Sequence, residues 1–196
     1  MLRPPLCDGK VRLPGNVVRR ASSAIIAMRD ERGSALLEFA VALPLLVVFV
    51  VGIFDFSGAF NQKQKIEQAA QEGAIIAGAQ PMSDIGSASP SMQAVQAAII
   101  NSLIASGVVS SSCAPVAGTL SGLTWTYSIS GCPGTLVITV NRGWSANSTP
   151  ASVGTRVTVQ YPYIWKFNSV IQLLIPGASY AATTQLTEVA TVHNQT

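Results

Sequence analysis

The sequence predicts an α+β protein, in which a long N-terminal transmembrane helix continues outside the membrane and packs against a small antiparallel β-sheet. Three observations support this fold class. Residues 39–54 form an uncharged, mostly apolar run between Glu38 and Asp55. Apolar residues recur at helical spacing after that run, and β-branched segments bounded by Gly and Asn occupy the C-terminal half. Strands that follow helices, and do not alternate with them, indicate an antiparallel sheet.

The charge distribution indicates a membrane topology. Charged residues make up 11% of the 196-residue chain and hydrophobic residues 48%, which suits a secreted or membrane-attached protein. The formal net charge of +3 comes from residues 1–33, because the remainder of the chain is slightly acidic. Basic residues before an apolar segment place the N-terminus in the cytoplasm and the following domain outside. A nucleic-acid-binding domain would need a basic patch of its own, so we expect no nucleic-acid partner.

Residues 34–56 are predicted to cross the lipid bilayer. As a helix, residues 34–54 would span about 31 Å, which matches the hydrocarbon core of a membrane. A cleavable secretory signal is the alternative, but no small-x-small cleavage site ends this apolar segment. Pro44 is expected to kink the helix, because its ring displaces the carbonyl group four residues earlier.

Residues 57–80 are predicted to continue the same helix outside the membrane. An apolar stripe at three- and four-residue spacing supports this prediction. Its members are Phe56, Phe60, Ile66, Ala70, Ala74 and Ala77. Pro81 then ends the helix. Gly58, Gly73 and Gly78, with nearby alanines, are expected to let another helix approach closely.

Residues 81–196 are predicted to form the exported α+β domain. A Ser/Gly/Pro-rich linker leads to a helix over roughly 91–105, whose apolar face is Val95, Ala98, Ile99, Leu103 and Ile104. Residues 107–118 are typical of a loop. Four strand-like segments follow at 123–130, 134–141, 154–161 and 179–192. In the first of them, Leu123, Trp125, Tyr127 and Ile129 alternate and should face the same side.

The two cysteines of this domain, Cys113 and Cys132, suggest one disulfide formed in an oxidising compartment. Its loop of about 20 residues would stabilise the fold by roughly 3 kcal/mol on the chain-entropy model. Two unpaired thiols are the alternative. Residues 131–134, with the sequence GCPG, should form a tight turn with Cys132 at its tip.

The residues of the exported domain do not indicate catalysis. The lone histidine, His193, lies in a polar tail, and no Cys/His set has the spacing of a zinc site. We therefore expect no enzymatic activity, no metal and no cofactor. Aromatic residues are concentrated in this region, and they suit either core and interface packing or a carbohydrate-binding patch. They are Trp125, Trp144, Tyr161, Tyr163, Trp165 and Phe167.

Gly33, Ser34 and Glu38 stand directly before the apolar run and resemble a type IV prepilin processing signal. The resemblance implies that a prepilin peptidase cuts between Gly33 and Ser34, so that residues 1–33 are a cleaved cytoplasmic leader. Glu38 would then be the fifth residue of the mature chain and would act in assembly. Translation from Met28 would give a leader of ordinary prepilin length. The alternative is an incidental Glu38 that reaches water at the membrane boundary.

A longer pattern extends along the predicted helix and consists of Glu38, Phe39, Pro44, Gly52, Asp55, Phe56, Ala69, Ala70, Glu72, Gly73 and Ala74. This pattern resembles the signature of the TadE-like family of pseudopilins from tight-adherence (Flp) pilus systems. Similarity is looser over residues 157–190. The resemblance implies a pilin-like fold and a minor pilin-like component of a pilus assembly or secretion apparatus.

The same resemblance implies the cellular context. The chain would be a single-pass protein of the bacterial inner membrane, with its C-terminal domain in the periplasm or outside the cell. Its partners would be the prepilin peptidase, other pilins or pseudopilins, inner-membrane assembly proteins and the lipid bilayer. A function of another class stays open, namely an uncleaved, signal-anchored periplasmic adhesin or ligand-binding module.

Overall fold

A computed structural model describes residues 31–84, 86, 89–146, 152–167, 172, 177 and 183–195. The N-terminal part of the predicted leader, including Cys7 and Met28, lies outside the described residues. The chain divides into two compact units, Met1–Phe49 and Val50–Thr196. The described part of the first unit is helical throughout, and the second unit contains the sheet.

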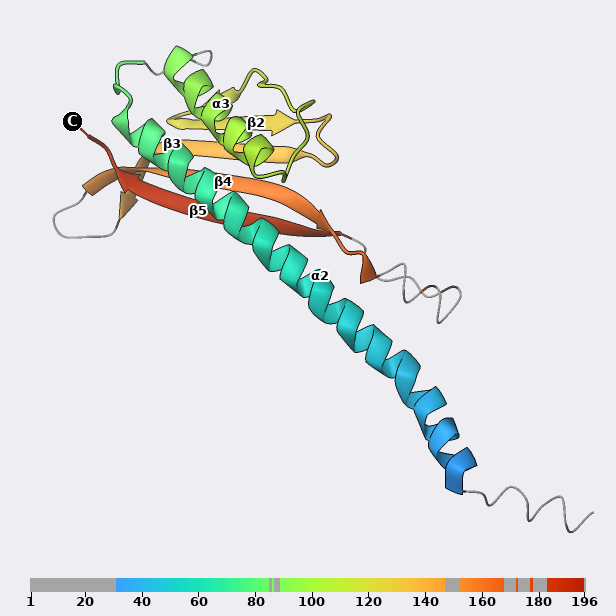
Figure 1. Ribbon diagram of the computed structural model, residues 1–196. Helices are drawn as coiled ribbons and strands as arrows, with labels where there is room; N and C mark the ends of the chain where they lie inside the picture. The colour runs from blue at the N-terminus through green and yellow to red at the C-terminus, as the bar shows by residue number, and fades with distance from the viewer. Residues whose placement is uncertain are drawn as a thin grey trace, which may run out of the picture. The chain divides into compact units, whose positions relative to one another are not determined.

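In the part of the chain that the structure describes, helices α2 and α3 precede a five-stranded sheet, which confirms the predicted α+β fold class (Figure 1). Helix α2 comprises Glu31–Ala79 and helix α3 comprises Pro90–Ala105. The strands are β1 (Thr119–Ser121), β2 (Thr124–Ile129), β3 (Leu136–Ala146), β4 (Ser152–Ile164) and β5 (Thr183–His193). Each strand pairs antiparallel with the next, so the order in the sheet is β1-β2-β3-β4-β5.

Within the second unit, α2 packs against the sheet through small residues. Its buried face consists of Ala59, Ile66, Ala69, Ala70, Ala74 and Ala77. A Cβ atom added at Gly73 would lie 2.5 Å from the Ile99 side chain and 3.6 Å from Val157. Small residues on this face therefore let α3 and the sheet approach the helix axis closely.

Two expectations for this part of α2 were wrong. Phe56 and Phe60 are not in the buried stripe, since they are 59% and 64% exposed. The expectation that glycines let another helix approach closely was wrong for Gly78, which lies against Val192 of β5. It holds for Gly73, which lies against Ile99 of helix α3. A Cβ atom at Gly78 would lie 3.1 Å from Val192, and the Gly78 carbonyl accepts a hydrogen bond from the Gln195 N–H at 3.0 Å.

Helix α3 lies close to its predicted position, and its ends follow from local sequence. Ser89 caps the N-terminus by accepting a hydrogen bond from the Met92 N–H, and proline occupies the first turn. At the other end, Gly107 adopts a φ of +70°, and the Val108 N–H bonds to the Leu103 carbonyl at 2.9 Å. This pattern is a Schellman motif, in which glycine adopts the left-handed conformation with little strain.

The sheet buries one face and leaves the other more polar, as is usual for an antiparallel sheet. Trp125, Tyr127 and Ile129 on β2 are buried, as are the alternating Val157 and Val159 on β4. The buried face forms one core with α2 and α3. Two further details differ from expectation. Leu123 precedes β2 and is 37% exposed, and β1 occupies Thr119–Ser121, where no strand was predicted.

The predicted disulfide is present in the structure. Cys113 and Cys132 are bonded, with their Cα atoms 5.1 Å apart, and both residues are buried. The bond joins the segment after α3 to the connection between β2 and β3. It thereby ties the loop that follows α3 to the sheet.

Candidate functional site: the apolar part of α2 and its junction with the sheet

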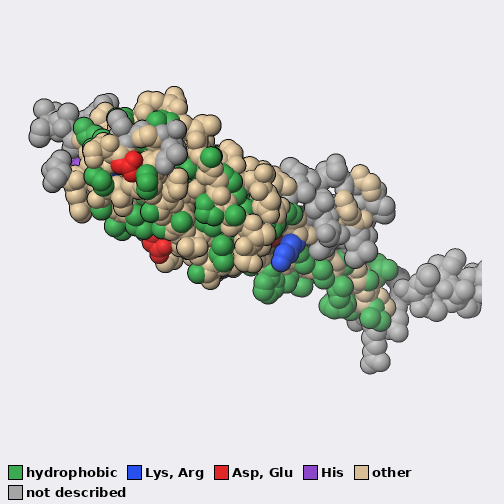
Figure 2. All heavy atoms as spheres, turned by 90° about the horizontal axis from the view of Figure 1, so that it is seen from above, with side chains coloured by type: hydrophobic (Ala, Val, Ile, Leu, Met, Phe, Trp, Pro, Cys, Tyr) green, Lys and Arg blue, Asp and Glu red, His purple; other side chains and the backbone are tan. Residues whose placement is uncertain are grey.

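The N-terminal part of α2 exposes large apolar side chains around its whole circumference. Among the described residues, α2 is the one helix long and apolar enough to cross a membrane. Its exposed members here are Leu36, Leu37, Phe39, Val41, Leu43, Leu45, Leu46, Val47 and Phe49. Hydrophobic side chains gather along this exposed helix in Figure 2. A helix that is apolar on every side requires an apolar environment, which a bilayer or neighbouring helices would provide.

The predicted processing and assembly residues lie in the first turns of α2. Gly33 has open space around the position of a Cβ atom, and Ser34 is exposed. Glu38 is also exposed and has no hydrogen-bond or ion-pair partner among the described residues. Because Ser34 and Glu38 are four residues apart in a helix, they lie on the same face. Pro44 lies inside α2, and the predicted kink there stays a prediction.

Asp55 forms the junction between α2 and the sheet. Its side chain is only 6% exposed. The Tyr163 hydroxyl donates a hydrogen bond to Asp55 Oδ1 at 2.7 Å, and the Phe167 N–H donates to Asp55 Oδ2 at 2.8 Å. Both donors belong to the C-terminal end of β4 and the residues directly after it. The carboxylate is thus satisfied by the domain itself.

Burial and the contact with Asp55 both affect the pKa of Tyr163. Burial raises the pKa of Tyr163 to about 12, and the hydrogen bond to Asp55 and its negative charge act in the same direction. The hydroxyl therefore stays protonated and remains a hydrogen-bond donor to Asp55 throughout the neutral range. A Cβ atom at Gly58 would lie 2.7 Å from the Tyr163 hydroxyl oxygen, so glycine leaves room for this contact.

Aromatic rings surround the junction. Trp165 packs edge-to-face against Phe56, with ring centroids 5.2 Å apart, and against Tyr163 at 5.0 Å. The Trp165 indole N–H donates to Thr184 Oγ1 at 2.6 Å. The adjoining hollow has a volume of about 160 Å³, which is below the 300–1,000 Å³ typical of small-molecule sites. Its dimensions indicate a packing junction between elements.

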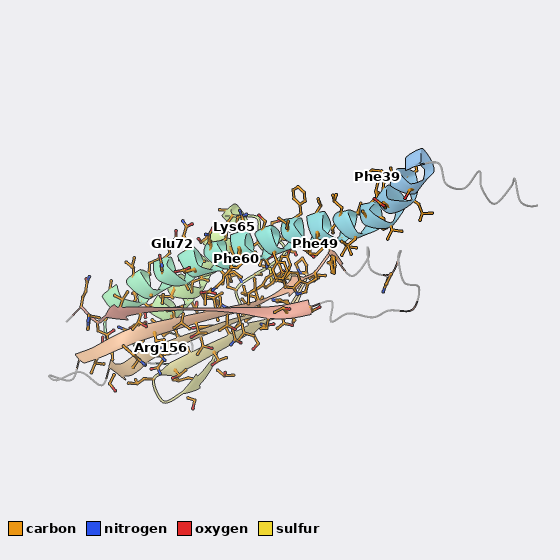
Figure 3. The ribbon with its side chains drawn as sticks, turned by 90° about the horizontal axis from the view of Figure 1, so that it is seen from below. Phe39, Phe49, Phe60, Lys65, Glu72 and Arg156 are labelled. Carbon is orange, nitrogen blue, oxygen red and sulfur yellow. A yellow bond between two sulfur atoms is a disulfide. The ribbon has the colours of Figure 1, made fainter. Side chains whose placement is uncertain are left out.

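Two further contacts hold the outer half of α2. Lys63 forms an ion pair with Glu188 of β5 at 3.5 Å. The fully buried Arg142 donates hydrogen bonds to the carbonyls of Gln80 and Pro81, directly after the end of α2. Lys65 and Glu72 lie on the side of the helix away from the sheet (Figure 3).

Ser34, Glu38 and Pro44 lie in one helix, as predicted, and that helix also includes Gly33. The roles assigned to these four residues stay predictions. The partners of Asp55 were not predicted from the sequence. The sequence contained one signal for these partners, because Asp55 directly follows an apolar run and a carboxylate in such surroundings requires a polar partner or water. In the described part of the chain, no group of three His, Cys, Asp or Glu residues is arranged to hold a metal ion.

These features define an α+β protein with one N-terminal helix that is apolar enough to act as a membrane anchor. The family model described as TadE-like protein matches residues 33–74, which confirms the resemblance to the TadE-like family over that segment. The match includes Gly33, Glu38, Pro44 and Asp55, and it ends before α3 and the sheet. No curated protein and no solved structure matches the chain. The looser resemblance over residues 157–190 stays a prediction.

Proposed function

We propose that the chain is a minor pilin-like component, or pseudopilin, of a tight-adherence (Flp-type) pilus assembly or secretion apparatus. The observation that carries the proposal is the TadE-like match, because it covers the whole exposed apolar part of α2. The similarity to this family supports an involvement of the chain in a tight-adherence pilus system. In this proposal the chain has no catalytic role, and its mechanism is assembly through helix–helix contacts.

The mechanism begins with removal of the leader by a prepilin peptidase between Gly33 and Ser34. Cleavage would create an α-amino group at Ser34, which has an ordinary pKa near 7.7–8.0 and is largely charged at neutral pH. Glu38 lies about 6 Å further along the helix. A carboxylate in hydrocarbon is costly, by about 2.5–3.5 kcal/mol at the centre of a helix, so pairing with the amine of a neighbouring subunit would favour association.

The exposed apolar side chains of α2 would first contact lipid and then neighbouring helices. In the membrane, the N-terminus would face the cytoplasm and the sheet would lie in the periplasm or outside the cell. The assembly partners would be other pilins or pseudopilins and inner-membrane assembly proteins. The exposure of Glu38, with no partner among the described residues, supports a role for it between subunits.

The mass of the purified mature protein tests the processing step. The proposal requires a chain that begins at Ser34. A chain that still carries residues upstream of Ser34 would contradict it and would favour an uncleaved, signal-anchored adhesin or ligand-binding module.

Substitution of Glu38 tests the assembly step. We expect Glu38→Ala to be cleaved and inserted normally but to lose incorporation into the assembled apparatus, as measured by co-purification with its other subunits. Glu67→Ala is the matched control, because Glu67 is also an exposed acid on α2 but lies in the second unit. Equal incorporation of both variants would remove the role assigned to Glu38.

A further inference from the structure

The end of the sheet nearest Asp55 carries an exposed patch that the assembly function does not explain. The patch consists of Phe54, Phe56, Ile164, Trp165 and Lys166, and we call it the basal patch. Phe54, Phe56 and Ile164 are 75%, 59% and 58% exposed. Phe54 and Phe56 lie on the two sides of Asp55, so apolar side chains are exposed on both flanks of the junction. Large apolar side chains that gather in this way usually mark an interaction site.

The basal patch contains residues of α2 and residues at the C-terminal end of β4 or directly after it. The rings of Phe56 and Trp165 are in contact, with their centroids 5.2 Å apart. Phe54 and Lys166 line a second hollow beside Tyr163. The hydrogen bonds from Tyr163 and Phe167 to Asp55 fix this end of β4 against the helix. Residues of the sheet domain are therefore held at the same level along the helix as Phe54 and Phe56.

That level coincides with the end of the candidate membrane span. Residues 34–54 cover about 31 Å of helix, which is the thickness of the hydrocarbon core. Phe54 and Phe56 would then lie at the outer boundary of the hydrocarbon. Through its ring contact with Phe56, Trp165 must lie at the same depth.

We propose that the basal patch rests in the lipid headgroup region, so that the sheet domain itself contacts the outer surface of the membrane. This inference rests on the membrane anchoring in the proposed function and adds a lipid-binding surface to it. The patch has the composition of a membrane interface, where tryptophan and other aromatic rings concentrate. The exposed Lys166 would be attracted to anionic headgroup phosphates.

Three hydrogen bonds adapt this region to partial burial in lipid. The Trp165 indole N–H already has an acceptor in Thr184, so no unpaired donor enters the apolar boundary. Asp55 is buried and accepts hydrogen bonds from Tyr163 and Phe167, so its carboxylate is shielded from the phosphates. Direct continuity along the chain with the candidate span favours lipid over a second protein as the occupant of the patch.

Tryptophan fluorescence of the full chain in lipid vesicles tests the inference. The vesicles would contain phosphatidylglycerol and phosphatidylcholine brominated either near the headgroup or near the methyl end of the acyl chains. We expect stronger quenching by bromine near the headgroup, and we expect Trp165→Phe to lose that quenching. Trp144→Phe is the matched control and should keep it, because Trp144 lies on β3 and stacks with Arg156 at 4.5 Å.

A second variant keeps the test independent of ring packing. Lys166→Glu retains every aromatic ring but places a carboxylate at the phosphates, so bromine quenching should fall and Trp165 emission should shift to the red. Circular dichroism of each variant would establish that the fold is retained.

The other outcomes overturn the inference in distinguishable ways. Quenching of Trp165 by aqueous iodide and not by bromine would place the patch in water. Shielding from both quenchers would indicate a protein contact, such as a second copy of the chain. If the chain floats with the vesicles but Trp165 is not quenched by bromine, the inference fails while the anchor stands. A chain that does not float with the vesicles would contradict both.

Discussion

The Tyr163 hydroxyl donates a hydrogen bond to the Asp55 carboxylate at 2.7 Å, between residues 108 positions apart in sequence. This contact joins the end of β4 to α2 where the uncharged part of the helix ends. A buried acid without donors would destabilise the domain, and here the domain supplies both donors. The contact therefore determines where the sheet begins to pack along the helix.

Removal of the Tyr163 hydroxyl should measure the strength of this junction. We expect Tyr163→Phe to lower the free energy of unfolding by about 1.5–3 kcal/mol, the range for a hydrogen bond to a charged group. Urea denaturation of the full chain in detergent micelles would measure the change. Tyr127→Phe is the control, because Tyr127 lies in the same core without an acidic partner among the described residues and should cost less. Equal losses in both variants would show that the Asp55 contact adds nothing.

Two of the buried tyrosines, Tyr127 and Tyr163, also predict a loss of stability at alkaline pH. Burial raises the pKa of Tyr127, and burial together with Asp55 raises that of Tyr163, from the ordinary value of 10.0 to about 12. Because the folded-state values exceed the unfolded ones, this stabilisation is complete below about pH 10 and is lost as the pH rises towards about 12. Urea denaturation at several alkaline pH values would measure it. The double variant Tyr127→Phe/Tyr163→Phe should show a shallower alkaline decline, and an unchanged slope would be inconsistent with these shifts.

Arg142 should be a strong determinant of stability because it caps the end of α2 from inside the core. Its guanidinium donates to the Pro81 carbonyl at 2.9 Å and to the Gln80 carbonyl. We expect Arg142→Ala to cost about 2–3 kcal/mol, because two carbonyls at the end of α2 lose a charged donor and the core loses a fully buried side chain. Arg156→Ala, which removes a partly exposed cation stacked on Trp144, should cost only about 0.5–1 kcal/mol. Thermal unfolding of both variants would rank them, and the reverse order would contradict the capping role.

Gly73 should tolerate a methyl group poorly, although alanine is the better helix former. The added Cβ atom would lie 2.5 Å from Ile99, which is fully buried. Overpacking costs about 1–3 kcal/mol and the gain in helix propensity is at most about 1 kcal/mol, so Gly73→Ala should be destabilising. Ile99→Val in the same chain removes a methyl group from the contact and should recover part of the loss. Additive losses in the double variant would show that the two positions are not coupled.

The helices could be predicted from sequence because their signals are local. The apolar run and the small residues after it repeat at helical spacing, and Ser89 with Pro90 marks the start of α3. Three strongly alternating or β-branched segments likewise gave β2, β3 and β4 at nearly their observed positions. In contrast, β1 has three residues and no apolar alternation, so local sequence does not distinguish it from a loop.

The junction could not be predicted because it depends on contacts between distant residues. Asp55 is recognisable in sequence as an acid after an apolar run, but its donors lie more than a hundred positions away. Phe56 and Phe60 fit the helical period of the buried stripe, yet the sheet packs on the face that contains Ala59 and Ile66. Periodicity gives the spacing of a buried face, and only the tertiary contacts decide which residues occupy it.

The attachment of the outer half of α2 at both ends has a mechanical consequence. Asp55 holds one end through Tyr163, while Arg142 and the Gln195–Gly78 hydrogen bond hold the other. A pulling force along the helix axis would load these contacts in shear and distribute the tension over all of them at once. The sheet would therefore resist being stripped from the helix far better under axial traction than under a force that peels one end away first.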